Sequence, residues 1–174
     1  MKIYIDGDGV IFNSVEKLFD EFHNIVDNLG LKISRAEYLY YSVEWNEWLE
    51  SCGFIKGSFE YLKENKKAIV LTKVFSSKEA KAKVSFMRRN KLKNDVIVVH
   101  KDLRKTDVVR AKNNILVDDT LENLNHWHEA GGKAIFFSKL GDNLERFDGF
   151  EKENTDYPMI SNLNEIEKIK RLIR

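Results

Sequence analysis

The chain has 174 residues, which is enough for one domain with a hydrophobic core and a small insertion. Its 29 Lys and Arg residues nearly balance its 28 Asp and Glu residues, and the net charge of +1 argues against the extended basic surface of a non-specific nucleic-acid binder. No apolar run approaches the about 20 residues of a membrane span, and no signal-peptide pattern precedes the first predicted strand. We therefore expect a cytoplasmic protein without a membrane contact.

The first predicted strand covers residues 2–6 and the second covers 68–72. A connection between parallel strands needs only about a dozen residues, so the segment 14–67 contains an insertion. Its apolar residues have helical spacing, as at Val15, Leu18, Phe19, Phe22 and Val26. We predict that 14–67 forms a small helical cap over the strand ends, with 1–13 and 68–174 as the α/β core.

A second helix of the insertion is predicted to begin at Ser34, because Glu37 three residues later completes a capping box, and to run to about Leu49. This segment is rich in aromatic residues, which could stack on a nucleobase. Tyr41, Trp45 and Trp48 also have the spacing of a buried helix face, so packing in the core is an equal alternative.

Strands and helices alternate after the insertion, which predicts an α/β fold with a parallel sheet covered by helices on both faces. Further strands are predicted at 95–99, 115–118 and 133–137. Helices are predicted after the capping box at Ser76 and Glu79, from Leu121 to Glu129 before Gly131 and Gly132, and along the stripe Leu163, Ile166, Ile169, Leu172 and Ile173.

The helix after 68–72 carries many basic residues, which we interpret as a solvated outer face. These residues are Lys78, Lys81, Lys83, Arg88, Arg89, Lys91 and Lys93.

The sequence Asp6-Gly7-Asp8-Gly9 follows the first strand, at the sheet edge where α/β proteins bind ligands. An Asp and Gly-rich turn is weak evidence alone, because such residues are common in ordinary turns. Three further elements strengthen it: Thr72 ends the second strand, Lys105 lies in the loop after the third, and Asp118-Asp119 end the fourth.

These four motifs, in this order, resemble those of the haloacid dehalogenase (HAD) superfamily. Asp6-Gly7-Asp8-Gly9-Val10-Ile11-Phe12 and the run from Leu116 to Asn123 look like motifs of its 5'(3')-deoxyribonucleotidase family, and Cys52-Gly53-Phe54 resembles a stretch of that family's cap. The resemblance covers roughly residues 1–140. Thr72 is followed by Lys73-Val74, where the nucleotidase pattern has Ser-Pro, and the prolines of that family's cap are missing.

The resemblance implies a HAD-like fold and phosphomonoester hydrolysis. Asp6 would be the nucleophile that forms an aspartyl-phosphate, and Asp8 would act as general acid and then as general base. Thr72 and Lys105 would bind the phosphoryl group, with Lys101 as the alternative lysine. A solvated basic loop and an ordinary strand-end threonine are the competing interpretations of these positions.

The resemblance also implies Mg²⁺ as cofactor, bound by Asp6, the backbone carbonyl of Asp8, and Asp119, while Asp118 would hold a metal-bound water. Which of the adjacent pair binds directly is left open, and either could also cap the following helix. Phe12, Lys73 and Trp45 are candidate substrate-binding residues.

The predicted function is magnesium-dependent hydrolysis of a small phosphate ester, with a nucleoside or deoxynucleoside 5'(3')-monophosphate favoured. The alternatives are a HAD phosphatase acting on a sugar phosphate, another metabolite or a nucleic-acid end, and a non-catalytic binding module with the same fold.

Overall fold

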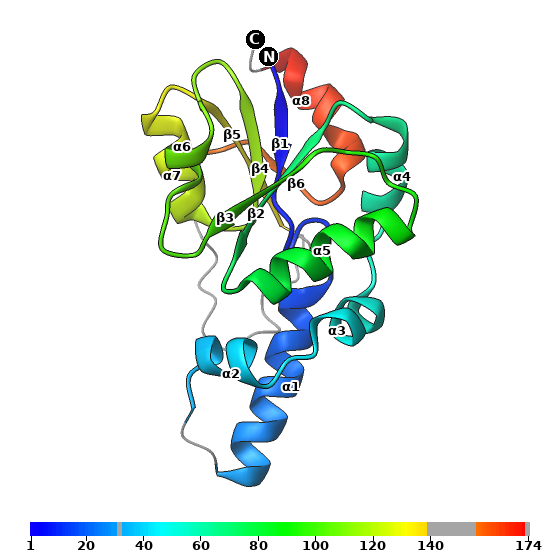
Figure 1. The fold of residues 1–174 in the computed structure, drawn as a ribbon. Coiled ribbons are helices and arrows are strands. Elements are labelled where there is room, and N and C mark those ends of the chain that lie inside the picture. Colours follow the sequence, from blue (N-terminus) through cyan, green and yellow to red (C-terminus); the bar gives the residue numbers. More distant parts are fainter. Residues whose placement is uncertain (31–32, 139–155, 173–174) are drawn as a thin grey trace.

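The computed structural model describes residues 1–30, 33–138 and 156–172, and its centre is a parallel sheet (Figure 1). The strand order is β3-β2-β1-β4-β5-β6, and every neighbouring pair is parallel. The strands are β1 (Ile3–Ile5), β2 (Ile69–Val74), β3 (Val96–His100), β4 (Ile115–Asp118), β5 (Lys133–Phe137) and β6 (Met159–Ile160).

The five predicted strands and the α/β class are confirmed. Strand β6 was not predicted, because two residues after Pro158 are too few to show an alternating pattern. Strands β2 and β4 lie on either side of β1, and the chain order runs in opposite directions on the two sides. The carboxyl ends of these three strands meet at one edge of the sheet. Such a switch point is where open α/β sheets bind ligands.

Alternating side chains on the strands build two hydrophobic clusters, one on each face of the sheet. Ile5, Val70 and Val117 pack against α4 (Ser58–Glu64), α5 (Ser77–Arg89) and α8 (Ile166–Leu172). On the other face, the neighbouring residues Tyr4, Leu71 and Leu116 pack near α6 (Lys105–Val108) and α7 (Leu121–Glu129). Burial on both faces accounts for the nearly continuous apolar runs of these strands.

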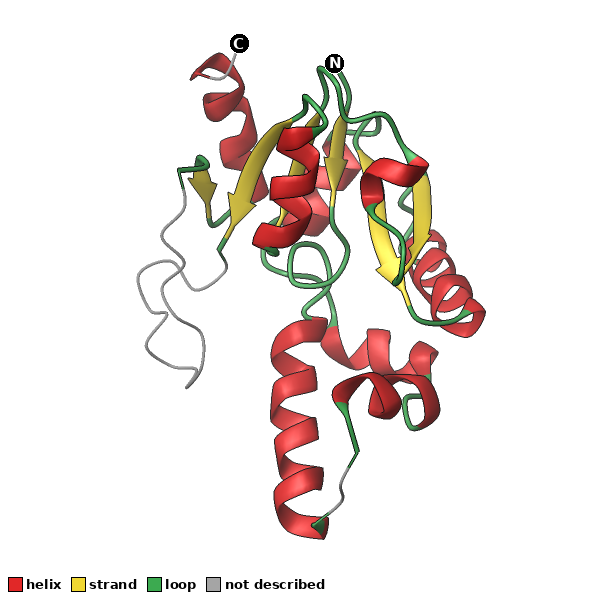
Figure 2. Cartoon of the chain, turned by 90° about the vertical axis from the view of Figure 1, so that its left-hand side faces the viewer, coloured by secondary structure: helices red, strands yellow, loops and turns green. Residues whose placement is uncertain are grey.

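The inserted helices α1 (Ser14–Leu29), α2 (Arg35–Tyr41) and α3 (Trp45–Cys52) lie beyond the carboxyl edge of the sheet (Figure 2). The capping box at Ser34 and Glu37 is confirmed. The single helix expected to continue to Leu49 is interrupted between Tyr41 and Trp45.

This interruption separates the three aromatic residues that were expected to share a face. The side chain of Tyr41 is 79% exposed, whereas Trp45 and Trp48 are each 5% exposed. Helix α4, which also falls within residues 14–67, lies beside the sheet against the 3₁₀ turn η2 (Leu163–Glu165) rather than beyond its edge.

The insertion leaves and re-enters the core through two adjacent segments. The Ile55 amide donates to the Ile11 carbonyl at 2.8 Å, and the Asn13 amide donates to the Gly53 carbonyl at 3.1 Å. Between these bonds, Phe12 and Phe54 face each other.

The C-terminal stripe forms η2 and α8, of which Leu163 and Ile166 are buried. Ile173 lies outside the described residues, as do the side chains of Val26 and Leu172. Within the described ranges, no helix has the length and apolarity needed to cross a membrane.

Candidate active site

The loop after β1 places Asp6 and Asp8 at the switch point of the sheet. The glycines of this loop are required because neighbouring side chains lie very close to them. A Cβ on Gly7 would lie 2.5 Å from Thr72 Oγ1, and a Cβ on Gly9 would lie 1.8 Å from Asp119 Oδ2. Gly9 also has a positive φ of 73°, which other residues adopt at a cost. The glycines therefore let the loop pack directly against the ends of β2 and β4.

Lys105 lies at the start of α6 and its ammonium is buried between two carboxylates. Its Nζ donates to Asp6 Oδ1 at 2.5 Å and to Asp118 Oδ2 at 2.6 Å. Lys101, the alternative lysine, is exposed and pairs with Asp102 at 3.0 Å. Of the two lysines, Lys105 is therefore the one that reaches Asp6.

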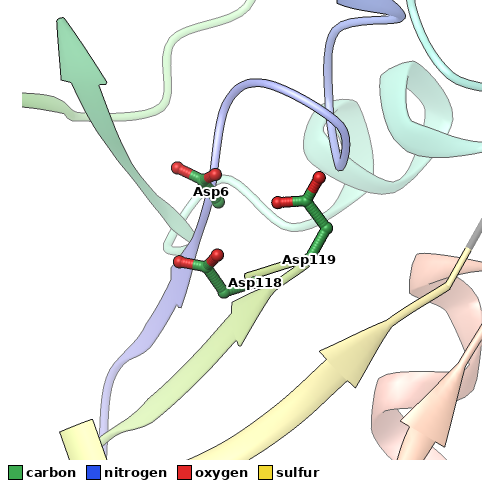
Figure 3. A group of neighbouring side chains, drawn as sticks. All are labelled: Asp6, Asp118 and Asp119. Carbon is green, nitrogen blue, oxygen red and sulfur yellow. The ribbon is translucent and has the colours of Figure 1, made fainter. Parts of the chain in front are cut away.

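Asp6, Asp118 and Asp119 form a cluster in which one carboxylate oxygen from each lies within 4.8 Å of the others (Figure 3). Asp118 is fully buried: besides Lys105, its carboxylate accepts from the Thr120 amide at 2.9 Å and from Asn123 Nδ2 at 3.2 Å. Asp119 is half-buried and lines the adjoining cleft.

The charges of this cluster are not balanced by its own residues, because three carboxylates share the ammonium of Lys105. Burial, together with the charges of Asp118 and Asp8, raises the pKa of Asp6 to about 7 despite the opposing effect of Lys105. Burial and the charges of Asp6 and Asp118 likewise raise the pKa of Asp119. A compact set of oxygen ligands with excess negative charge fits a divalent cation such as Mg²⁺.

Asp8 is held by residues that the sequence did not assign to the site. Ser14 Oγ donates to its Oδ1 at 2.6 Å, and the Lys83 ammonium forms an ion pair with its Oδ2. The interpretation of Lys83 as a solvated residue is wrong, since its side chain is 0% exposed. Burial lowers the pKa of Lys83, but the charges of Asp8 and Glu79 outweigh that effect and raise it.

Lys83 does not stand out in the sequence because it is one basic residue among several on α5. The available signal was the helical periodicity: Ala82, Lys83, Phe86 and Met87 form the buried side of this helix. A lysine within an apolar stripe needs a buried partner, and that requirement points to the carboxylates of the site.

Thr72 is fully buried beneath Gly7 and is absent from the lining of the cleft. Its Oγ1 donates to the Lys73 carbonyl at 3.3 Å and accepts a hydrogen bond from Lys83 Nζ at 3.2 Å. In the structure, the hydroxyl of the threonine that was predicted to bind a phosphoryl group contacts the buried lysine.

A cleft of about 220 Å³ opens beside Asp6, Asp8 and Asp119. Lys73, Trp45 and other side chains of both the core and the inserted helices line it; these are Ser14, Val15, Leu18, Leu39, Trp48, Phe75, Glu79, Thr120 and Asn123. The cleft therefore combines a carboxylate-rich end with an apolar and aromatic wall.

Phe12 is not part of this wall, although it was a candidate substrate contact. Its side chain is 0% exposed, and its ring packs against Phe54 and Phe86 at centroid distances of 6.1 and 5.9 Å. The residue belongs to the core where the insertion joins the sheet, so that Trp45 and Lys73 are the candidates that border the cleft.

No protein-family model and no curated protein matches the sequence. Solved structures match it along nearly the whole chain. A HAD-superfamily hydrolase of subfamily IA, variant 1, from Geobacter sulfurreducens PCA has a TM-score of 0.62 at 13% identity, over 97% of this chain and 99% of its own. A HAD phosphatase from Thermococcus onnurineus has a TM-score of 0.59 at 18% identity, over 98% of both chains.

A third similar structure is that of YfnB, a HAD protein from Bacillus subtilis described as bound to magnesium. Its TM-score is 0.58 at 14% identity, and 97% of each chain is covered. At these identities the likeness concerns the fold. The chain therefore has the fold of the HAD-superfamily hydrolases.

Proposed function

We propose that the protein is a magnesium-dependent phosphomonoesterase that works through an aspartyl-phosphate on Asp6. The observation that carries this proposal is the contact of Asp6 with Lys105 inside a cluster of carboxylates, with Asp8 at the same cleft. Phosphoryl transfer requires a positioned nucleophile and positive charge to offset the anionic phosphoryl oxygens. Asp6 supplies the nucleophile, and Lys105 supplies part of the charge.

In the first proposed step, an oxygen of Asp6 attacks phosphorus while the bond from phosphorus to the leaving-group oxygen breaks. Asp8 gives its proton to that oxygen, so the product leaves as an alcohol. In the second step, water attacks phosphorus and gives a proton to Asp8 while the bond from phosphorus to the Asp6 oxygen breaks. Inorganic phosphate leaves, and both side chains return to their starting state. Asp8 fits this double role because its side chain is 32% exposed on the cleft.

Mg²⁺ would be held by Asp6, Asp119 and the backbone carbonyl of Asp8, and when bound it would neutralise charge on the phosphoryl oxygens. Asp119 suits direct binding because it lines the cleft. Both oxygens of Asp118 already accept hydrogen bonds, which suits a role in orienting a metal-bound water. The magnesium bound to the similar protein YfnB supports this choice of ion.

The favoured substrate is a nucleoside or deoxynucleoside monophosphate. Support comes from the apolar side of the cleft, where Trp45 and Trp48 of the insertion and Phe75 of the core offer aromatic surface to a base. Lys73 lies on the same cleft and could pair with the phosphate. We propose that residues 14–67 act as a substrate-selecting cap through α1, α2 and α3, which supply this wall.

The test is phosphate release from a panel of nucleoside, deoxynucleoside and sugar monophosphates, with Mg²⁺ and with a chelator. We expect Mg²⁺-dependent release that is fastest for a nucleotide, is abolished in Asp6→Asn and persists in Asp20→Asn, a matched change at an exposed position of α1. A preference for sugar phosphates would contradict the nucleotide assignment. No release from any member by folded, Mg²⁺-loaded protein would contradict the phosphatase proposal and favour a non-catalytic binding module.

A further inference from the structure

Lys83 is a buried ammonium with four oxygen partners around it. Its Nζ forms an ion pair with Asp8 and another with Glu79 Oε1 at 2.7 Å, and it donates to Thr72 Oγ1 at 3.2 Å and to the Lys73 carbonyl at 3.1 Å. An ammonium has three protons, so these acceptors use its full donor capacity. Lys83 is also absent from the lining of the cleft, and it therefore acts through its neighbours rather than on a ligand.

Glu79, one turn earlier on α5, is fixed in place as well. Its Oε2 accepts from the Phe75 amide at 2.7 Å, and its own amide donates to Ser76 Oγ at 3.2 Å. From the inserted helices, the ring of Trp45 lies 5.9 Å from Lys83 Nζ and helps to cover the ammonium. The charge of Lys83 is thus held rigidly on the core and shielded from water.

The Asp8 carboxylate is therefore held at both of its oxygens. Lys83 holds Oδ2, Ser14 holds Oδ1, and part of the side chain still faces the cleft. Mere packing does not require this arrangement, because burying an ion pair gains little over apolar side chains of similar volume. An ammonium linking the cleft carboxylate to the buried Thr72 suggests a role in the chemistry.

We propose that Lys83 is a positioning residue that holds the Asp8 carboxylate in its reactive orientation. This inference rests on the proposed phosphatase function. Positioned acid–base groups contribute about 10²- to 10⁴-fold to enzyme rates, and misplacing such a group loses part of that factor. Removing the ammonium should therefore lower kcat by about 10- to 100-fold and leave KM within about 3-fold, since Lys83 does not touch the cleft.

The experiment is a double-mutant cycle with Lys83→Met and Asp8→Asn, scored by steady-state turnover of 4-nitrophenyl phosphate in Mg²⁺. Lys81→Met is the matched control, because Lys81 lies on the exposed side of the same helix. Lys83→Arg keeps a positive charge and should recover part of the lost kcat. Circular dichroism establishes that each variant is folded, and Lys83→Arg replaces Lys83→Met in the cycle if the latter does not fold.

We expect the change at position 83 to lower kcat in the wild-type background and to have an effect under about 3-fold in the Asp8→Asn background, because the group it positions is gone. An equal loss in both backgrounds, or no loss in the wild-type background, would overturn the inference. Failure of the proposed function has a different outcome, since wild-type protein would then show no Mg²⁺-dependent turnover.

Discussion

The ammonium of Lys105 lies 2.5 Å from Asp6 Oδ1, although 98 residues separate the two in the chain. The parallel sheet produces this contact, since Asp6 directly follows the end of β1 and the chain enters α6 at the same edge. The same ammonium also pairs with Asp118, so that one lysine compensates carboxylates from two adjacent strands.

Replacing Lys105 with Met should abolish measurable phosphatase activity and destabilise the metal-free protein by about 3–5 kcal/mol, because it leaves buried carboxylates without a counter-charge. Urea unfolding in the presence of a chelator measures the second effect. Lys101→Met, in the exposed neighbouring loop, is the control and should change neither quantity appreciably. Unaltered turnover in Lys105→Met would refute the role assigned to this lysine.

The raised pKa of Asp6 predicts how the stability of the metal-free protein depends on pH. The pKa rises from 3.8 to about 7 on folding, so between these values the folded state keeps a proton that the unfolded state has lost. The free energy of unfolding should therefore fall as pH rises from about 4 to 7. Asp119, whose pKa is also raised, contributes in the same direction.

Thermal unfolding of wild type and Asp6→Asn in chelator, from pH 5 to pH 8, tests this slope. As pH rises, the melting temperature of Asp6→Asn should increase relative to that of wild type. Added Mg²⁺ should stabilise wild type more at pH 8 than at pH 5.5, because the ion binds deprotonated carboxylates. A wild-type melting temperature that rises relative to Asp6→Asn over this range would show that the sign is incorrect.

Gly9→Ala should weaken Mg²⁺ binding at least about 10-fold, because the added methyl group would lie 1.8 Å from Asp119 Oδ2 and must displace this proposed ligand. Gly30→Ala is a matched control: Gly30 also has a positive φ, but no heavy atom lies within 4 Å of its added Cβ. Calorimetric titration with Mg²⁺ distinguishes the two. Equal affinities in both variants would mean that Asp119 is not a ligand.

Trp45→Phe should raise KM for a nucleoside monophosphate more than KM for glycerol phosphate, because it removes part of an aromatic surface at the cleft. The expected change in the ratio of the two KM values is about 5-fold or more. The ratio is informative because a general distortion of the cleft would affect both substrates alike. Tyr41→Phe, at an exposed position, should leave it unchanged. A parallel rise for both substrates would count against base stacking.

The sequence predicted the parts of the site that depend on local signals. Asp6, Asp8 and the pair at Asp118 follow apolar strand runs, and parallel strands bring such ends together. Spacing alone could not choose between Lys101 and Lys105, because the choice depends on where the chain turns into α6. In the structure, Lys105 contacts Asp6 and Asp118.

What the sequence could not predict are the residues whose roles depend on tertiary packing. Lys83 is chemically identical to its exposed neighbour Lys81, and only the placement of α5 buries one of them. Phe12 follows the first motif directly, yet its ring is buried in the core, next to the bond from Ile55 to Ile11. The two residues of β6 form a strand because they pair with β5, and their own sequence shows no strand pattern.

The bonds between residues 11–13 and 53–55 bring the two ends of the intervening segment next to each other. The chain thus departs from the sheet and returns to it at one place, where the rings of Phe12 and Phe54 pack against each other. A segment attached in this way is modular: its length and sequence can diverge while the register of β1 and β2 is preserved. The side chains that line the cleft from the inserted helices could therefore change while the carboxylates and lysines of the core stay in place.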